Sequence, residues 1–140
     1  MRERRSGRIG TVSGLALLVG GTAVAAVAGG THSIFATIML GLLAMSLGHA
    51  LVTEIQRQAR RQTVSWTAAD TVNAILLLAW SVVALTGTIL ANGPLPVRAV
   101  GLALSLSYAL SAAYFVRDRR RTITRLAAPA VTVPTPAESR

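Results

Sequence analysis

The sequence contains no cysteine, and its 14 basic residues are all arginines. The absence of cysteine excludes disulfides, thiolate metal sites and a cysteine nucleophile. Aromatic residues make up only 4% of the 140 residues, too few for a surface on which nucleic acid bases could stack. Charged residues are also scarce, at 14%, whereas 52% of the residues are hydrophobic. A water-soluble chain of this length cannot bury so much apolar surface in one core, so the composition indicates a lipid environment.

A long segment near the start of the chain carries no charge. It runs from Ile9 to Thr53, and as a single helix it would be about 68 Å long. The hydrocarbon core of a bilayer is only about 30 Å thick, so this segment predicts two membrane spans. Glycines and small polar residues at 29–33 are typical of a turn between them. We therefore predict spans at 9–29 and 33–53.

Two further charge-free segments follow, and each has a recognisable helix start. Thr67 and Asp70 form a variant of the capping box, which predicts a span at about 69–91. Asn92 and Gly93, followed by Pro94 and Pro96, interrupt the chain because proline lacks an amide hydrogen. A fourth span is predicted at 96–116. The expected fold is all-α, a polytopic integral membrane protein with four transmembrane helices in an antiparallel bundle.

The segments outside the predicted membrane domain, residues 9–116, are polar. They are a basic N-terminus at 1–8, a loop at 54–68, and a tail at 117–140 that is first basic and then rich in proline and alanine, a composition that favours disorder. Most arginines lie in these three segments, whereas Arg98 alone lies in the turns of the opposite side. The positive-inside rule therefore places both termini and the 54–68 loop in the cytoplasm.

The arginines also help to identify the location and partners of the chain. They flank the spans in three separate clusters instead of forming one continuous face, so we expect no nucleic acid partner. The small size and the exclusive use of arginine favour the cell membrane of a prokaryote. Residues 1–28 also resemble a cleavable signal peptide, and cleavage there would leave three spans. This alternative is less consistent with the length of the apolar segment.

Small residues recur at helix-packing spacing in three of the predicted spans. Such residues let helix backbones approach closely in lipid, where there is no hydrophobic drive between helices. The stripes favour packing within the bundle, and their abundance makes a homo-oligomer or a partner membrane subunit a reasonable expectation. The candidate packing residues are Gly10, Gly14, Gly41, Ala44, Gly48, Gly101, Ser105, Ala109 and Ala113.

Two other sets of polar residues are candidates for binding. Hydroxyl and amide groups on the third and fourth spans could line a pathway for a small solute or ion, although hydrogen bonding between helices is the favoured explanation. The arginines after the fourth span are candidates for contacts with anionic lipid headgroups. The pathway candidates are Asn73, Ser81, Thr88, Ser107 and Ser111, and the headgroup candidates are Arg117, Arg119, Arg120 and Arg121.

The sequence offers no constellation for catalysis, and we expect no enzyme activity and no cofactor. Its two histidines fall at opposite ends of one predicted span, and the only acidic residue within a span is Asp70, in the first turn of the third. His49 could ligate a haem together with a second copy or another subunit. The composition and the packing stripes predict an accessory or scaffold subunit that works through helix packing. The alternatives are an oligomeric channel or facilitator for a small solute or ion, and a membrane haem-binding subunit that uses His49.

Overall fold

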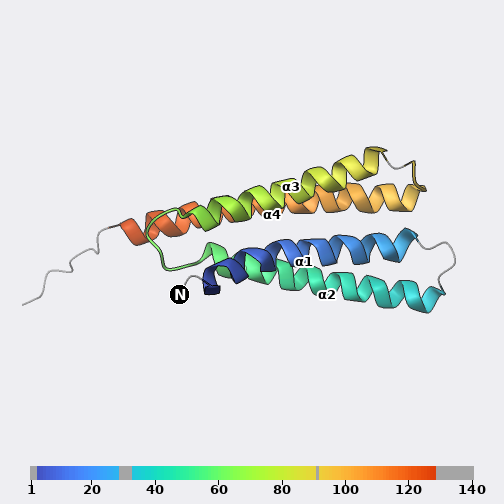
Figure 1. Ribbon diagram of the computed structural model, residues 1–140, viewed down its shortest axis with the longest axis horizontal. Helices are drawn as coiled ribbons and strands as arrows, with labels where there is room; N and C mark the ends of the chain where they lie inside the picture. Colours follow the sequence, from blue (N-terminus) through green and yellow to red (C-terminus); the bar gives the residue numbers. More distant parts are fainter. Residues whose placement is uncertain (1–2, 29–32, 91, 129–140) are drawn as a thin grey trace, which may run out of the picture.

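The computed structural model of the protein describes residues 3–28, 33–90 and 92–128. These residues form four helices: α1 (Glu3–Ala28), α2 (Ile34–Ala59), α3 (Ala68–Leu90) and α4 (Leu95–Ala127). Figure 1 shows two antiparallel hairpins side by side, one made of α1 and α2 and the other of α3 and α4. The most extensive contacts are within each hairpin, and fewer join the hairpins to each other. The predicted all-α class is confirmed.

Each of the four helices is long and apolar enough to cross a membrane. Most large apolar side chains on them are exposed, among them Ile34, Met45 and Leu90. Apolar side chains directed outward are favourable in lipid and unfavourable in water. The chain therefore has four candidate membrane-spanning helices, which suggest a multi-pass membrane protein.

The helices extend beyond the predicted spans at the end of the bundle that carries the basic segments. The predicted 54–68 loop is helical as far as Ala59, and the first part of the predicted 117–140 tail continues α4 to Ala127. The length of an apolar segment indicates only how much of a helix lies in lipid. Arginine and glutamine are good helix formers in water, so a helix that contains them can continue beyond the lipid. The predicted turn at 29–32 and the tail from residue 129 lie outside the described residues.

Local sequence explains where three of the helices begin. The Ser33 hydroxyl accepts a hydrogen bond from the Ala36 amide at 3.2 Å, which caps α2. Thr67 precedes α3, and its amide donates to the Asp70 carboxylate at 2.9 Å, as the predicted capping-box variant requires. Proline is favoured in the first turn of a helix, and Pro96 occupies that turn in α4.

The buried core lies at one end of the bundle. We call this the basic end, because the start of α1, the α2–α3 connection and the end of α4 meet there; the opposite end, where α1 and α3 finish, we call the turn end. Between residues 10 and 28 of α1 the buried side chains are Val12 and Ala16, and in α2 burial begins only at Leu51. The two hairpins are thus held together at the basic end, while toward the turn end the inner faces of α1 and α2 are only partly covered.

By contrast, α3 and α4 pack closely along most of their length. The Ser81 hydroxyl donates to the Ser105 backbone carbonyl at 2.8 Å, and Gly101 lies directly against the Thr88 side chain. A Cβ atom added at Gly101 would collide with the Thr88 hydroxyl oxygen. Glycine at this position therefore permits the close approach that the predicted stripe on the fourth span requires.

Gly101→Ala should destabilise the protein because the new methyl group forces α3 and α4 apart. We expect a loss of about 1–3 kcal/mol, the usual effect of overpacking. Gly14→Ala is the matched control, since a Cβ there meets nothing within 4 Å and alanine favours the helix. Unfolding in detergent micelles, followed by circular dichroism, measures both. Equal stability of the two variants would contradict this account of α3–α4 packing.

Candidate functional site

Arg119 is the most deeply buried charged residue of the described chain, with an exposed fraction of 0%. Its guanidinium reaches from α4 into the α2–α3 connection, where Nη1 donates to the Arg61 carbonyl at 2.9 Å and Nη2 to the Ser65 carbonyl at 3.0 Å. Nη2 also contacts the carbonyl and hydroxyl of Thr63. A single side chain thus satisfies carbonyl groups along the whole connection between the two hairpins.

Asp70 supplies the negative charge that accompanies Arg119. Its Oδ2 lies 3.2 Å from Nε of Arg119, and the carboxylate is 1% exposed. The same oxygen accepts hydrogen bonds from the Thr67 amide and hydroxyl, each at 2.9 Å. A buried ion pair is tolerated only where further hydrogen bonds satisfy both partners, and this pair has them. Asp70 therefore caps α3 and also joins α3 to α4.

A second polar contact lies one turn further along α3. The Asn73 amide donates to the side-chain oxygen of Gln58, and Gln58 in turn donates to Glu54 at 2.7 Å. Asn73 and Gln58 are both buried. This contact joins α3 to α2, so the polar groups at the basic end link the two hairpins instead of lining a passage.

A more exposed ion pair lies near this cluster. Arg60 Nε is 3.6 Å from Asp118 Oδ2, and the Arg60 side chain is 68% exposed. Hydrogen bonding to the Tyr114 side chain, together with the charge of Asp118, raises the pKa of Arg60 above its ordinary value. Because solvent screens such a pair, it adds little to stability.

The predicted headgroup contacts require one correction. Arg119 cannot reach a lipid headgroup because its guanidinium is enclosed by Asp70 and the α2–α3 connection. Arg117, Arg120 and Arg121 are exposed. Positions 117, 120 and 121 share one face of a helix, whereas 119 points elsewhere, which separates a structural arginine from its neighbours.

The predicted pathway residues do not come together in one place. Asn73, Ser81 and Thr88 are buried along the inner face of α3, but Ser107 is exposed and donates to the Ala103 carbonyl. Ser111 lies in a separate depression beside Val52 and Ile55 of α2. The partner of Ser81 is Ser105, a residue that we had assigned to packing. The Ser81 and Thr88 hydroxyls and the Asn73 amide nitrogen are thus used in hydrogen bonds within the chain, whereas the buried Asn73 Oδ1 has no hydrogen-bond partner among the described residues.

The predicted packing residues fall into two groups. Gly101 and Ser105 are buried between α3 and α4, whereas Gly10 and Gly14 are exposed, and Ala109 and Ala113 lie in a shallow depression on α4. Gly41, Ala44 and Gly48 are half-buried on α2. A Cβ atom added at Gly41 or Gly48 would meet nothing within 4 Å. The α4 stripe is therefore used inside the bundle in part, and the α2 stripe has room for a neighbour.

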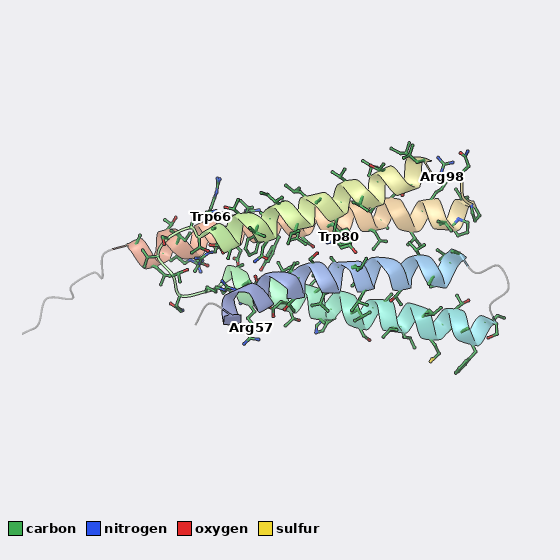
Figure 2. The ribbon with its side chains drawn as sticks, in the orientation of Figure 1. Arg57, Trp66, Trp80 and Arg98 are labelled. Atoms are coloured by element: carbon green, nitrogen blue, oxygen red, sulfur yellow. The ribbon has the colours of Figure 1, made fainter. Side chains whose placement is uncertain are left out.

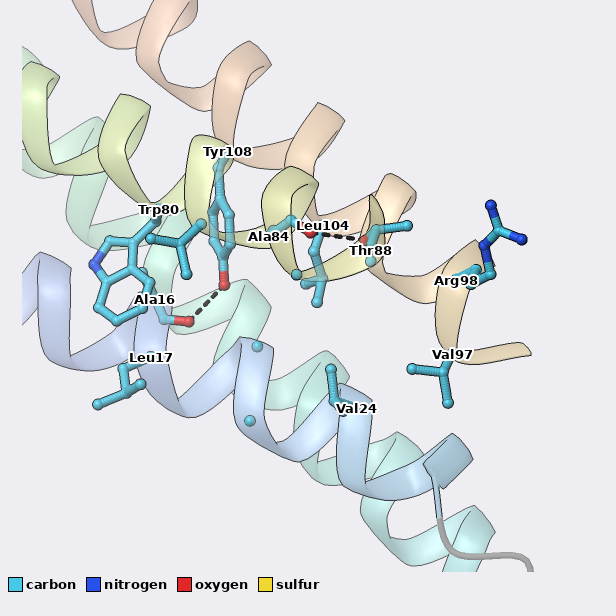
Figure 3. A pocket seen from close by; sticks show the side chains of 15 residues that line it. Ala16, Leu17, Val24, Trp80, Ala84, Thr88, Val97, Arg98, Leu104 and Tyr108 are labelled. Carbon is cyan, nitrogen blue, oxygen red and sulfur yellow. Dashed lines mark hydrogen bonds between the residues drawn. The ribbon is translucent and has the colours of Figure 1, made fainter. Parts of the chain in front are cut away.

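An apolar groove of about 400 Å³ opens between α1, α3 and α4 toward the turn end. Figure 3 shows Tyr108 at one end of it, where its hydroxyl donates to the Ala16 carbonyl, and Val97 and Arg98 at the other. Thr88 in the wall donates to the Ala84 carbonyl at 2.7 Å, and Trp80 donates to Ser13 at 2.9 Å. Because these polar groups already have partners, the groove suits an apolar occupant.

Figure 2 shows how the labelled polar and aromatic side chains are distributed along the bundle. Arg57 and Trp66 lie at the basic end, Trp80 lies between the hairpins, and Arg98 lies at the turn end.

His49 is exposed on α2. No group of three or more histidine, cysteine or acidic residues in the described part of the chain could hold a metal ion. His32, the other histidine, lies outside that part.

Comparison with known proteins finds no matching family model, no matching curated protein and no matching solved structure. The role of the chain therefore has to be inferred from its own residues and their arrangement.

The pairing of Arg119 with Asp70 is the main feature that the sequence analysis missed. We had interpreted Asp70 as a helix cap and Arg119 as one of a basic cluster, and 49 residues separate them. One signal was present: Asp70 begins a predicted span and Arg119 follows another that runs the opposite way, so both fall at the same end of an antiparallel bundle.

Removing either partner of this ion pair should strongly destabilise the protein. Asp70→Asn or Arg119→Met leaves one buried charge without its partner, which costs about 3–5 kcal/mol. Arg120→Gln, on the exposed side of the same helix turn, is the control and should change stability by less than about 0.5 kcal/mol. Unfolding in detergent of both single variants and the double variant measures the coupling. Strictly additive effects would show that the two charges do not interact.

Proposed function

We propose that this chain is an accessory or scaffold subunit of the cell membrane of a prokaryote, which works by helix packing without catalysis. The observation that carries the proposal is the inner face of α2, which is only partly covered within the chain. No residue of α2 from Ile34 to Ala50 is buried, although Gly41, Ala44 and Gly48 lie on the same helix face as buried Leu51. The face has open space beside Gly41 and Gly48, and we propose that a second helix, from another copy or from a partner subunit, packs there.

Small residues make such a face suitable for a helix partner. Without a hydrophobic drive between helices in lipid, association depends on close backbone approach and on van der Waals packing. The corresponding stripe on α4 provides an internal example, because Gly101 and Ser105 bring α4 against α3. The α2 stripe has the same chemistry, and a Cβ atom added at Gly41 or Gly48 would meet no described atom within 4 Å.

The hydrogen bonding of α3 favours this role over a channel. A polar pathway needs groups that are free to replace the hydration of a solute. Ser81 and Thr88 instead donate to backbone carbonyls, and the Asn73 amide donates to Gln58. Likewise, exposed His49 belongs to no group of three or more histidine, cysteine or acidic residues within the described residues, so nothing there supports a metal site.

We further propose that the basic end faces the cytoplasm and that both termini lie there. The support is the distribution of arginine, since Arg98 is the one arginine at the turn end among the described residues. A membrane with anionic lipid on the cytoplasmic leaflet favours this arrangement.

Substitution at the α2 stripe should abolish association and leave the fold intact. The double variant Gly41→Leu/Gly48→Leu fills the open space, and we expect its co-purification with a partner or second copy from mild detergent to fall at least tenfold. The matched control is Ala50→Leu, which adds a leucine to an exposed position about 200° around the helix from Gly48. Native mass spectrometry reads the outcome. Unchanged assembly in the double variant, or a monomer without partners in the parent protein, would contradict the proposed role.

Single cysteines report the orientation directly, because the natural chain has none. In intact cells or right-side-out vesicles, Asn92→Cys should react with a membrane-impermeant maleimide, whereas Thr124→Cys should react only after the membrane is opened. Both positions are exposed, so reactivity reports the side of the membrane and not burial. The reverse labelling pattern would invert the proposed topology.

A further inference from the structure

A shallow apolar depression lies on α3 and α4 at the basic end, separate from the groove near the turn end. Its floor is built from small and aliphatic side chains, including Ala74 and Leu78 of α3 and Ala109 and Ala113 of α4. Its volume is about 620 Å³. No acidic residue lines it.

Three arginines form one end of this depression. Arg117, Arg120 and Arg121 all line it, and all three are exposed. They follow Ala109 and Ala113 along the same face of α4, because positions 109, 113, 117, 120 and 121 are spaced by three or four residues or adjoin one another. The depression is thus apolar at one end and strongly cationic at the other.

A carboxylate lies beside this region: Asp118 is half-buried, is paired with Arg60 of the α2–α3 connection, and lines a separate depression with Arg117 and Arg121. Arg119, between the exposed arginines in sequence, is turned inward and bound to Asp70. Its buried contacts hold this part of α4 as a helix, so the three exposed guanidinium groups stay on one face. They remain positively charged under all ordinary conditions and present several donors each.

We infer that this depression binds one anionic phospholipid, with an acyl chain along Ala109 and Ala113 and the headgroup phosphate against Arg117, Arg120 and Arg121. From Ala109 to Arg121, α4 rises about 18 Å. This length matches one leaflet, about 15 Å of hydrocarbon, with the headgroup just beyond it. Guanidinium groups bind phosphate oxygens in a bidentate manner, which explains arginine at all three positions. The site also explains Ala109 and Ala113, whose stripe is incompletely used in helix packing.

This inference depends on membrane insertion and not on the accessory role. If the accessory role is wrong, the chain can still bind the lipid. If the lipid site is wrong, the chain can still assemble through α2. The two proposals therefore fail independently.

The test is competition between two lipids with the same acyl chains, phosphatidylglycerol and phosphatidylcholine, on the delipidated full-length protein, read by native mass spectrometry. One arginine near an anionic surface contributes about fivefold in affinity. Arg117→Gln/Arg121→Gln should therefore lower the preference for phosphatidylglycerol about 25-fold. The matched control, Arg57→Gln/Arg98→Gln, removes the same charge from exposed arginines elsewhere and should leave most of the preference intact.

A second pair of variants tests the apolar part of the site without changing charge. Ala113→Phe fills the depression and should reduce phosphatidylglycerol binding at least fivefold, whereas Ala103→Phe, at an exposed position of α4 outside it, should not. Equal loss in the two double-arginine variants would reduce the effect to overall charge and overturn the inference. Undiminished binding in Ala113→Phe would also overturn it. If Ala113→Phe does not fold, the comparison of the two double-arginine variants alone tests the inference.

Discussion

The buried ion pair between Arg119 and Asp70 is the constraint on which the arrangement of the bundle depends. Removing two charges from water is unfavourable unless each finds a full set of partners. Arg119 meets this requirement by binding the carbonyls of Arg61, Thr63 and Ser65, and Asp70 meets it by capping α3 through Thr67. The requirement therefore brings the end of α4, the start of α3 and the α2–α3 connection to one place.

Because the ion pair and its hydrogen bonds lie at one end, the two halves of the bundle differ. At the basic end, Val12, Leu51, Leu77 and Phe115 form a common core next to the ion pair. Toward the turn end, α3 and α4 stay in contact through Gly101 and Thr88, but α1 and α2 contribute no buried residue. In lipid the exposed surface is not penalised, so a bundle closed at one end and open at the other can persist. The open half is where the proposed protein partner would bind, and the outer surface at the basic end is where the proposed lipid would bind.

The arginines near the end of α4 illustrate why one residue type serves two purposes. Four of them lie within five positions, 117–121, and a helix distributes them around its circumference. Arg119 points into the protein and completes the core, whereas Arg117, Arg120 and Arg121 point outward beside an apolar depression. A charge cluster in a sequence is thus not a single feature. The role of each arginine in the cluster depends on the helix face on which it lies and on the groups that it contacts.

The sequence by itself determined the helical class, the number of candidate spans and the start of α3. These follow from local properties: the length of charge-free segments relative to the thickness of a bilayer, and a capping pattern four residues long. It did not determine which polar residues are paired, because Asp70 and Arg119, or Ser81 and Ser105, are distant in the chain and meet only when helices pack. It also did not distinguish Gly101, which packs against Thr88, from Gly41, where an added Cβ atom would meet nothing within 4 Å. Both glycines have the same local spacing, and only the position of the neighbouring helix decides which one is in contact.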